Sequence, residues 1–309
     1  MTRFTNNLPP ALSGAALMLL AGLLFALVNT LVQQATMIAG LAPSHVAFWQ
    51  YLIALLFSGP WLVAMGVKTL STTRPLLHVL RVLLAAAGVQ FWVMSLAHVP
   101  IWQAIALIML SPFFVTFGAS VFLREQASPE RWCAVLTGFV GGMIILAPWS
   151  DAFSSHALLA VAAAAMWAFS SLLTKHLTAT ETPASLTIYL LMLLTPINAV
   201  LAINQGLAPR WDGTIWLVIG AGLLTALAQY ALAKAYSLTD AAYLQPFDHL
   251  KLPLNVGLGI VAFGFVPPGS MWLGSALIVG ASLFLLRQEM DTPPAKPPAS
   301  GPATAPQQS

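Results

Sequence analysis

Long apolar stretches follow one another along the chain and are separated by short polar connections. Ten of these windows reach the length of about 20 residues that a helix needs to cross a bilayer. They span residues 11–33, 43–65, 76–97, 101–123, 131–147, 156–177, 184–205, 214–236, 241–264 and 271–287. The pattern predicts an all-α membrane protein with ten transmembrane helices. The first window is too long for a signal peptide and is followed by nine more, so we expect a retained helix.

The positive charges sort by side of the membrane. Nine of the twelve Lys and Arg residues lie at the N-terminus or at alternate connections, all on one predicted side, and they are Arg3, Lys68, Arg74, Arg81, Arg124, Arg131, Lys175, Arg287 and Lys296. Arg210 is the one cation of the opposite connections. The positive-inside rule therefore predicts that both termini face the cytoplasm.

The second half of the chain repeats features of the first. Proline and aromatic residues recur at shifts of 134 to 142, in the pairs Pro60/Pro196, Pro112/Pro246, Trp132/Trp272 and Phe25/Trp167. Because each half would hold five helices, an odd number, the second half is predicted to be inverted in the membrane. Inverted repeats with helices broken by proline are typical of alternating-access transporters. Pro112 and Pro246 are the predicted kinks, although membrane helices also tolerate proline without any such role.

These features divide the chain into four predicted parts. Residues 1–10 form a cytoplasmic N-terminus, 11–147 a first five-helix repeat and 156–288 a second one. Residues 289–309 form a Pro- and Ala-rich tail that we expect to be disordered.

Composition excludes several classes of protein. The chain is 59% hydrophobic and only 7% charged, whereas soluble domains carry about 25% charged residues. Its basic residues form no patch, so we expect no nucleic acid partner. The lone Cys133 cannot form an internal disulfide or a metal cluster by itself, and no cofactor or metal is predicted. The expected partners are the lipid bilayer and a small-molecule solute, and a homodimer is left open.

One polar stretch interrupts the ninth window. Gln245, Asp248, His249 and Asn255 share one face of a helix drawn through residues 241–264, with Lys251 at its edge. A charge at the centre of a spanning helix costs roughly 2.5–3.5 kcal/mol on insertion scales. We therefore expect this face to turn toward protein or water and the opposite face toward lipid.

Several segments resemble EamA-type permeases of the drug/metabolite transporter superfamily. Residues 97–100 (AHVP), 103–107 (QAIAL) and 110–116 (LSPFFVT) are similar to the family's third-to-fourth helix signature, and residues 246–249 (PFDH) to its Pro-Phe-Glu-Tyr segment. The resemblance runs to about residue 288. It implies a ten-helix fold, a central cavity formed mainly by spans 1, 3, 4, 6, 8 and 9, and movement of a small organic solute. The chain departs from the family pattern at Gln50, where an Arg is usual, and at Phe25, where a Trp is usual.

The candidate site residues each have a plainer alternative. Asp248 and Lys251 would bind a solute or take part in proton coupling, or would neutralise each other as an internal salt bridge. His249 would relay protons or serve as a hydrogen-bonded structural histidine. The amides of Asn29, Gln90, Gln229 and Gln245 would converge on a polar solute, or hold helices together. Trp167 and Tyr230 would stack on a planar or cationic solute, although membrane aromatics more often pack or anchor.

Other ionisable residues lie near the ends of spans. Snorkelling to the headgroups accounts for His45, His78, Arg81, Lys175 and Lys234.

The leading hypothesis is a secondary transporter in the cytoplasmic membrane that moves a small organic metabolite by alternating access, coupled to an ion or proton gradient. The sequence leaves amino acids, nucleoside-like or adenosyl metabolites and aromatic cations open. An intramembrane enzyme is disfavoured because no His-Glu-x-x-His or Gly-x-Ser-x-Gly motif occurs. A passive channel fits inverted repeats less well.

Overall fold

The computed structural model describes residues 9–64, 72, 74–122, 128–151, 153–177, 180–181, 183–209, 211–238, 244 and 247–291. All regular elements among these residues are helical. They are α1 (Pro10–Gln33), a π-helical turn (Gln34–Ile38), α2 (Pro43–Ala64), α3 (Pro75–Leu96), α4 (Ile101–Ile108), α5 (Ser111–Phe122), α6 (Pro129–Leu146), α7 (Ala157–Leu177), α8 (Pro183–Ala202), a 3₁₀ turn (Ile203–Gln205), α9 (Ile215–Leu238), α11 (Lys251–Phe263) and α12 (Gly269–Asp291). The prediction of an all-α protein is confirmed.

Proline defines where many of these helices begin. The first residue of five helices is a proline, namely Pro10, Pro43, Pro75, Pro129 and Pro183. A proline is well placed there because its missing N–H would have no partner in the first turn anyway. In α6 the hydroxyl of Ser128 also accepts a hydrogen bond from the backbone N–H of Arg131, at 3.4 Å. The sequence pattern of short polar links ending in proline therefore sets the helix starts.

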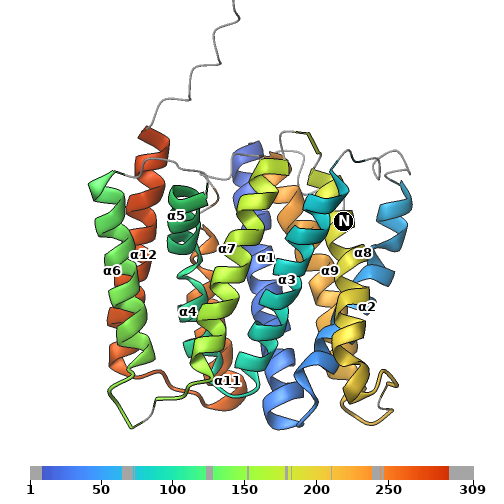
Figure 1. The fold of residues 1–309 in the computed structure, drawn as a ribbon. Helices are drawn as coiled ribbons and strands as arrows, with labels where there is room; N and C mark the ends of the chain where they lie inside the picture. Colours follow the sequence, from blue (N-terminus) through green and yellow to red (C-terminus); the bar gives the residue numbers. More distant parts are fainter. Residues whose placement is uncertain are drawn as a thin grey trace, which may run out of the picture.

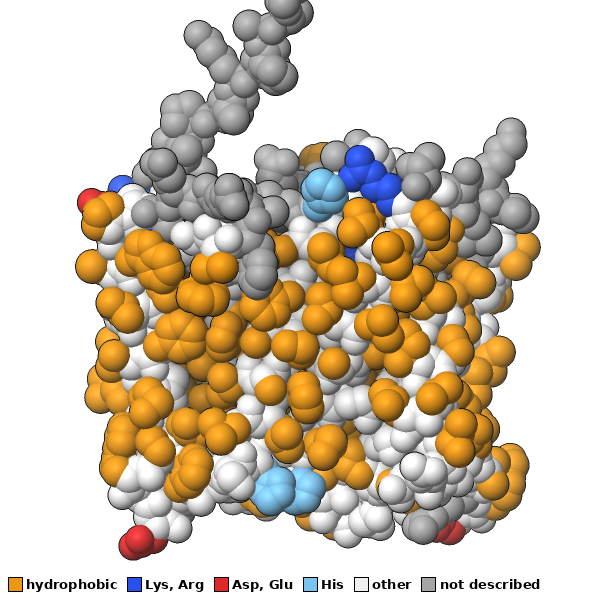
Figure 2. Space-filling model, viewed as in Figure 1, with side chains coloured by type: hydrophobic (Ala, Val, Ile, Leu, Met, Phe, Trp, Pro, Cys, Tyr) orange, Lys and Arg blue, Asp and Glu red, His pale blue; other side chains and the backbone are white. Residues whose placement is uncertain are grey.

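The bundle has the surface of a membrane protein. Seven helical segments are long and apolar enough to cross a bilayer: 12–38, 75–96, 101–121, 129–146, 157–174, 185–205 and 215–235. The helices run along a common direction (Figure 1). On the face drawn in Figure 2, hydrophobic side chains cover the middle, and charged side chains lie close to the two ends. Large apolar residues such as Leu56, Val63 and Val261 are exposed on this kind of surface, as lipid contact requires.

Helices from the two halves of the chain interlock. The most extensive pairs are α1 with α9, α3 with α7 and α6 with α12, and α2 packs on both α8 and α9. In Figure 1, α6 and α12 stand together at one side of the bundle and α2 and α8 at the other. Each helix of the first half thus buries its apolar surface mainly against the second half.

The tightest of these contacts uses two glycines. A Cβ atom added to Gly274 would lie 2.6 Å from the backbone oxygen of Gly141, and one added to Gly141 would lie 2.6 Å from that of Gly274. Both distances are too short for a side chain, so the backbones of α6 and α12 meet directly. This is the close helix approach that small residues permit in membranes.

Two helices are interrupted at equivalent places. Between α4 and α5, the Leu110 N–H donates to the Leu107 oxygen (3.1 Å) and the Phe114 N–H donates to the Leu110 oxygen (3.3 Å). Before and within α11, Leu250 donates to Phe247 (3.2 Å) and Leu254 donates to Leu250 (3.2 Å). The same backbone pattern therefore recurs 140 residues later.

These breaks correct the expectation of one continuous helix through residues 241–264. α11 begins at Lys251, and a turn at His249 and Leu250 separates it from Asp248. The physical reason is Pro253, which lies in the first turn of α11, just as Pro112 lies in the first turn of α5. A proline there lacks only an N–H that would be unpaired, whereas inside a continuous helix it would clash with the preceding turn. The predicted kink at Pro112 is thus a break that precedes it, and Pro246 lies outside the described residues.

The link between α3 and α4 is held by Gln33. Its fully buried side chain donates through Nε2 to the backbone oxygens of Leu96 (3.1 Å) and Val99 (2.7 Å). Its Oε1 accepts a hydrogen bond from the N–H of Ile101, at 3.2 Å. Backbone N–H and C=O groups at helix ends have no partner within the helix, and they need other hydrogen-bond partners above all in an apolar interior. One amide from α1 supplies three of them.

Candidate functional site

A chain of amide hydrogen bonds crosses the interior between α3, α1 and α11. The indole Nε1–H of Trp92 donates to Oδ1 of Asn29 at 3.2 Å. Nδ2 of Asn29 donates to Oδ1 of Asn255 at 3.0 Å, and Nδ2 of Asn255 donates to the backbone oxygen of Lys251 at 2.6 Å. We call Asn29, Trp92 and Asn255 the central polar cluster. All three side chains are buried, and each amide keeps one more N–H and further lone pairs for a solute.

A charge pair continues this chain at the start of α11. Nζ of Lys251 lies 2.6 Å from Oδ2 of Asp248, and the two side chains are 30% and 32% exposed. The structure therefore forms the predicted contact between these residues. His249 beside them is partly buried, and its Nδ1 has no hydrogen-bond partner in the described part of the protein. Because the acid and the base neutralise each other, this wall of the cluster carries no net charge.

Two tryptophans stand side by side next to the amides. The ring centroids of Trp92 and Trp167 are 6.0 Å apart, with an angle of 48° between the ring planes. Nε1 of Trp167 donates to the backbone oxygen of Ala85 at 3.3 Å. The indole fits against Gly88, where an added Cβ would lie 2.5 Å from the Trp167 ring. Gly88 thus sets the position of one aromatic wall.

The structure separates the remaining predicted residues into other places. Gln90 donates through Nε2 to Oδ1 of Asn198 in α8 at 2.8 Å, away from Trp92 on the α3 helix. Tyr230 is 51% exposed on α9, and its neighbour Gln229 is partly buried. Gln245 lies outside the described residues. Of the predicted residues, the structure places Asn29 in the central polar cluster, pairs Asp248 with Lys251, whose backbone oxygen accepts from Asn255, and sets Trp167 beside Trp92.

Asn198 is a polar residue that the sequence analysis missed. It is fully buried, and its Nδ2 has no partner in the described structure. The signal was available, because Asn198 is a single amide two residues after Pro196 in an otherwise apolar helix. The sequence predicts Asn255 only as a member of a polar face, and its contact with Asn29 joins helices far apart in the sequence.

The snorkelling predicted for His78 and Arg81 is wrong. Their side chains are buried, with exposures of 0% and 4%. Glu181 in the α7–α8 connection lies 3.6 Å from His78, and Nη2 of Arg81 donates to the backbone oxygen of Leu186 at 2.8 Å. Arg81 points between helices because a carbonyl and a hydroxyl oxygen accept hydrogen bonds from its guanidinium there, and the ring of His78 lies near the acid of Glu181. The sequence contains no pattern that predicts a contact between Glu181 and α3.

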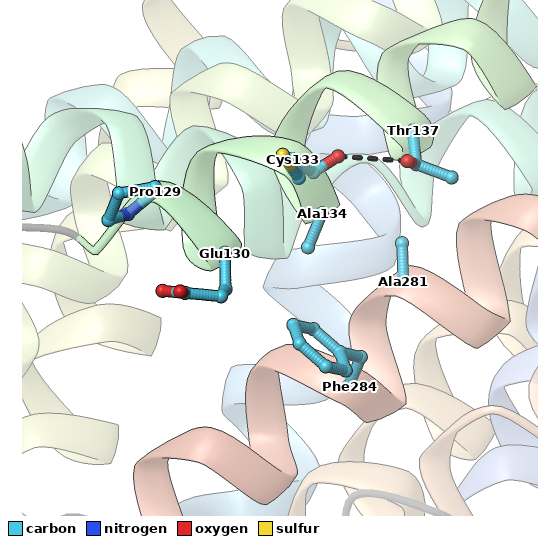
Figure 3. Close-up of a pocket in the computed structure, with 7 residues that line it drawn as sticks. All are labelled: Pro129, Glu130, Cys133, Ala134, Thr137, Ala281 and Phe284. Atoms are coloured by element: carbon cyan, nitrogen blue, oxygen red, sulfur yellow. Dashed lines mark hydrogen bonds between the residues drawn. The ribbon is translucent and has the colours of Figure 1, made fainter.

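An open groove lies elsewhere, on the outer side of α6 and α12. It is lined by Pro129, Glu130, Cys133, Ala134, Thr137, Ala281 and Phe284. In Figure 3 the ring of Phe284 and the methyl groups of Ala134 and Ala281 form its floor, and the Thr137 hydroxyl is bonded to the Cys133 backbone oxygen. None of the predicted site residues lines this groove, and Thr137 already has its hydrogen bond. The central polar cluster is the better candidate for solute recognition.

Comparisons with known proteins agree with a membrane transporter. The model of the EamA-like transporter family matches residues 12–147 and again residues 154–287. The chain is 53% identical to a riboflavin transporter of Rhizobium johnstonii, over 91% of this chain and 93% of that protein. It is 49% identical to a riboflavin transporter of Vibrio cholerae, with coverages of 90% and 94%.

More distant similarities point the same way. An S-adenosylmethionine uptake transporter of Rickettsia bellii is 29% identical over 79% of this chain and 84% of that protein. A solved crystal structure superposes with a TM-score of 0.58 at 20% identity, covering 92% of this chain and 99% of the other. That likeness concerns the fold alone. The two family matches together cover most of the residues from 12 to 287, and the chain therefore belongs to the EamA-like transporter family, a family of multi-pass membrane permeases in the drug/metabolite transporter superfamily.

Proposed function

We propose that this protein carries riboflavin across the cytoplasmic membrane. The observation that carries the proposal is the similarity to riboflavin transporters from three bacteria, at 53%, 49% and 50% identity over 87% or more of this chain. The S-adenosylmethionine transporters are much less similar, at 29% identity or below. Among the solutes that the sequence leaves open, a planar aromatic one with polar edges is the best supported.

The chemistry of the central polar cluster suits this solute. Riboflavin has a flat, uncharged isoalloxazine ring whose edge holds both hydrogen-bond donors and acceptors. Trp92 and Trp167 offer aromatic faces for such a ring, and the amides of Asn29 and Asn255 can both donate and accept at its edge. A buried site that hydrogen-bonds its ligand discriminates strongly against analogues without the matching groups. Because Asp248 and Lys251 pair with each other, neither of them requires a charged solute as its partner.

We infer that transport proceeds by alternating access between two inverted five-helix repeats. The helix pairing supports this, because exchanging the halves turns the α1–α9 pair into the α7–α3 pair and leaves α6–α12 unchanged. The matching breaks at Leu110 and Leu250 support it as well. In this arrangement α4 and α5 form one broken crossing and α11 the end of another, which gives ten crossings with both termini cytoplasmic. Broken helices near the solute are usual in such transporters.

Coupling to an ion gradient is the last part of the proposal. Asp248 is an ionisable group that pairs with the side chain of Lys251, and the backbone oxygen of Lys251 accepts a hydrogen bond from Asn255 of the central polar cluster. Ionisable residues inside membrane bundles mark ion and proton pathways more often than they serve structure alone. We therefore place proton coupling at the Asp248–Lys251 pair.

Uptake by reconstituted vesicles tests the solute. Purified protein in proteoliposomes is expected to give saturable movement of radiolabelled riboflavin, with accumulation against its gradient when the lumen is alkaline. Unlabelled riboflavin should compete, and excess S-adenosylmethionine should not. Uptake of S-adenosylmethionine without any uptake of riboflavin would contradict riboflavin as the solute. Equilibration without saturation would indicate a channel, and a chemically altered flavin an enzyme.

A further inference from the structure

Three ionisable side chains are buried together at the end of the bundle where α3 begins. His78 and Arg81 come from α3, and Glu181 comes from the connection between α7 and α8. Their exposures are 0%, 4% and 9%. Buried charges are costly unless they are paired and hydrogen-bonded. Together with their partners described below, we call them the α3-end cluster.

Glu181 is held mainly from the first half of the chain. The hydroxyl of Thr72, just before α3, donates to Oε1 of Glu181 at 2.5 Å. Nε2 of His78 lies 3.6 Å from the same oxygen. Ser185 at the start of α8 donates to Oε2 at 3.2 Å. If α3 and Thr72 moved away, Ser185 would be the one of these described partners that the carboxylate keeps.

Arg81 makes the reverse connection, from α3 to the second half. Its Nη2 donates to the Leu186 backbone oxygen (2.8 Å) and its Nη1 to the Thr174 hydroxyl (3.4 Å). The hydroxyl of Ser170 in α7 donates to the backbone oxygen of Arg81 at 3.0 Å. All these bonds run between the halves, so separating α3 from α7 and α8 would break them together.

The ring of His78 lies against that of Tyr189 in α8, with centroids 4.2 Å apart and the ring planes tilted by 34°. Both of its ring nitrogens lack a hydrogen-bond partner in the described structure. The imidazole is therefore held by packing and by the nearby acid rather than by hydrogen bonds. Such a group loses its environment as soon as α3 shifts.

The opposite end of the bundle is built differently. There, Nδ1 of His45 lies 2.9 Å from the backbone oxygen of Gly206, and His98 stacks on His156 with centroids 4.0 Å apart. The latter two rings are exposed. Among the described residues, His78 and Glu181 form a contact between a buried base and a buried acid, whereas the opposite end has no buried contact of this kind in that part of the chain. The two ends of the proposed pathway are thus unequal.

We propose that the α3-end cluster is a latch that keeps this end of the bundle shut, and that it must break each time the solute passes that side. The proposal rests on the alternating-access function. The contacts of the α3-end cluster allow two discrete arrangements. In one, the cluster is dry and the contacts described above are formed. In the other, the cluster is open and water solvates His78, Arg81 and Glu181. Partly separated positions of α3 relative to α7 and α8 are unfavourable, because they would leave ionisable groups buried without partners.

Electron spin resonance distances between the two halves test the latch. The exposed Cys133 is first replaced by serine. Spin labels are then placed at Leu76→Cys, 78% exposed on α3, and at Ser171→Cys, exposed on α7. In the latched protein one short distance should dominate. Glu181→Gln should add a longer distance and raise the ratio of open to closed molecules by on the order of tenfold, as expected for weakened bonds to a charged group. Thr72→Val should act in the same direction with a smaller effect.

Arg74→Gln is the matched control. Nη1 of Arg74 lies 2.8 Å from Nε2 of His176 in an exposed contact between α3 and α7, outside the α3-end cluster. This variant should leave the distance distribution unchanged. If Glu181→Gln does not fold, Thr72→Val decides alone. Distributions identical to the unsubstituted pair in both variants, or an equal shift in Arg74→Gln, would overturn the latch. No solute is present in this measurement, so its outcome is independent of whether riboflavin is the substrate.

Discussion

Asn29 of α1 donates a hydrogen bond to Asn255 of α11 at 3.0 Å, across 226 residues of sequence. The bond joins the two halves of the chain at the place where an indole donor from Trp92 also arrives. Two amides that complete each other can exchange that contact for one with a solute at little cost, because each group keeps a partner. This makes the pair a suitable recognition element for an uncharged ring.

Replacing Asn255 tests that role. Asn255→Leu keeps the side-chain size and removes both the acceptor for Asn29 and the donor to Lys251. We expect riboflavin affinity, measured by quenching of tryptophan or flavin fluorescence, to fall by about tenfold or more, since a lost buried hydrogen bond costs about 1–3 kcal/mol. Asn204→Leu, at an exposed position after α8, is the control. An affinity within about twofold of the unsubstituted protein would remove Asn255 from the site.

The position of Trp167 depends on the glycine opposite it. Gly88→Ala would place a Cβ 2.5 Å from the indole ring of Trp167, so the ring must shift and its arrangement with Trp92 must change. We expect weaker riboflavin binding together with a shift of the tryptophan emission spectrum. Gly59→Ala in α2 meets nothing within 4 Å and should change neither. Equal affinities for the two variants would show that the Trp92–Trp167 arrangement is not used for binding.

The contact between α6 and α12 makes a separate prediction about stability. Gly274→Ala brings a Cβ to 2.6 Å from the Gly141 backbone oxygen, and a backbone cannot turn aside as a side chain can. We expect a loss of about 1–3 kcal/mol, typical of overpacking, seen as a lower midpoint in thermal unfolding in detergent. Gly280→Ala on the same helix meets nothing within 4 Å and should leave the midpoint unchanged or raise it slightly. Similar midpoints for both variants would contradict direct backbone contact.

Much of this fold could be predicted from hydrophobic pattern alone. The bounds of α1, α2 and α3 differ from the predicted windows by at most one residue at each end, because lipid requires long apolar helices and the chain marks their starts with proline. The break before α11 was missed since Pro253 was not weighed against the polar run before it. A proline in the third position of a helix is a start signal that the sequence does contain.

The site was harder to predict than the helices. Asp248 and Lys251 are three residues apart, and local spacing was enough to bring them together. Gln90 was a plausible neighbour of Asn29 by residue type, yet it turns to Asn198. Only the packing of α3 between α7 and α8 decides which face of α3 meets which amide. Glu181 reaches His78 through such packing too, and no local pattern encodes that.

Acid should weaken the protein through Glu181. The hydroxyl of Thr72, which donates to its carboxylate, holds the pKa of Glu181 below the ordinary value of 4.5, and Ser185 and His78 act in the same direction. A lowered pKa in the folded state means that the stabilisation is complete above the unfolded pKa and is lost as the pH falls through the folded one. The titratable group that faces Glu181 is His78, whose Nε2 lies 3.6 Å from Oε1.

The measurement is the thermal midpoint in detergent as a function of pH, for the unsubstituted protein and for Glu181→Gln. The unsubstituted protein should be the more stable at neutral pH, and its advantage should shrink below about pH 4.5 as the carboxylate becomes neutral like the amide. A constant difference between the two curves down to acid pH would show that the charge of Glu181 contributes nothing.

Asp248→Asn tests the proposed coupling. The substitution removes the charge that lies 2.6 Å from Lys251 while keeping a group of the same shape that can hydrogen-bond. If protonation of this carboxylate drives accumulation, the variant should still exchange labelled for unlabelled riboflavin across proteoliposomes at equal concentrations, but should not concentrate it in response to a pH gradient. Asp151→Asn, in the exposed connection after α6, is the control and should accumulate normally. Accumulation by Asp248→Asn equal to that of the unsubstituted protein between about pH 5.5 and 8 would leave Asp248 as the partner of Lys251 and nothing more, because a transporter coupled through this group cannot keep its gradient response without it.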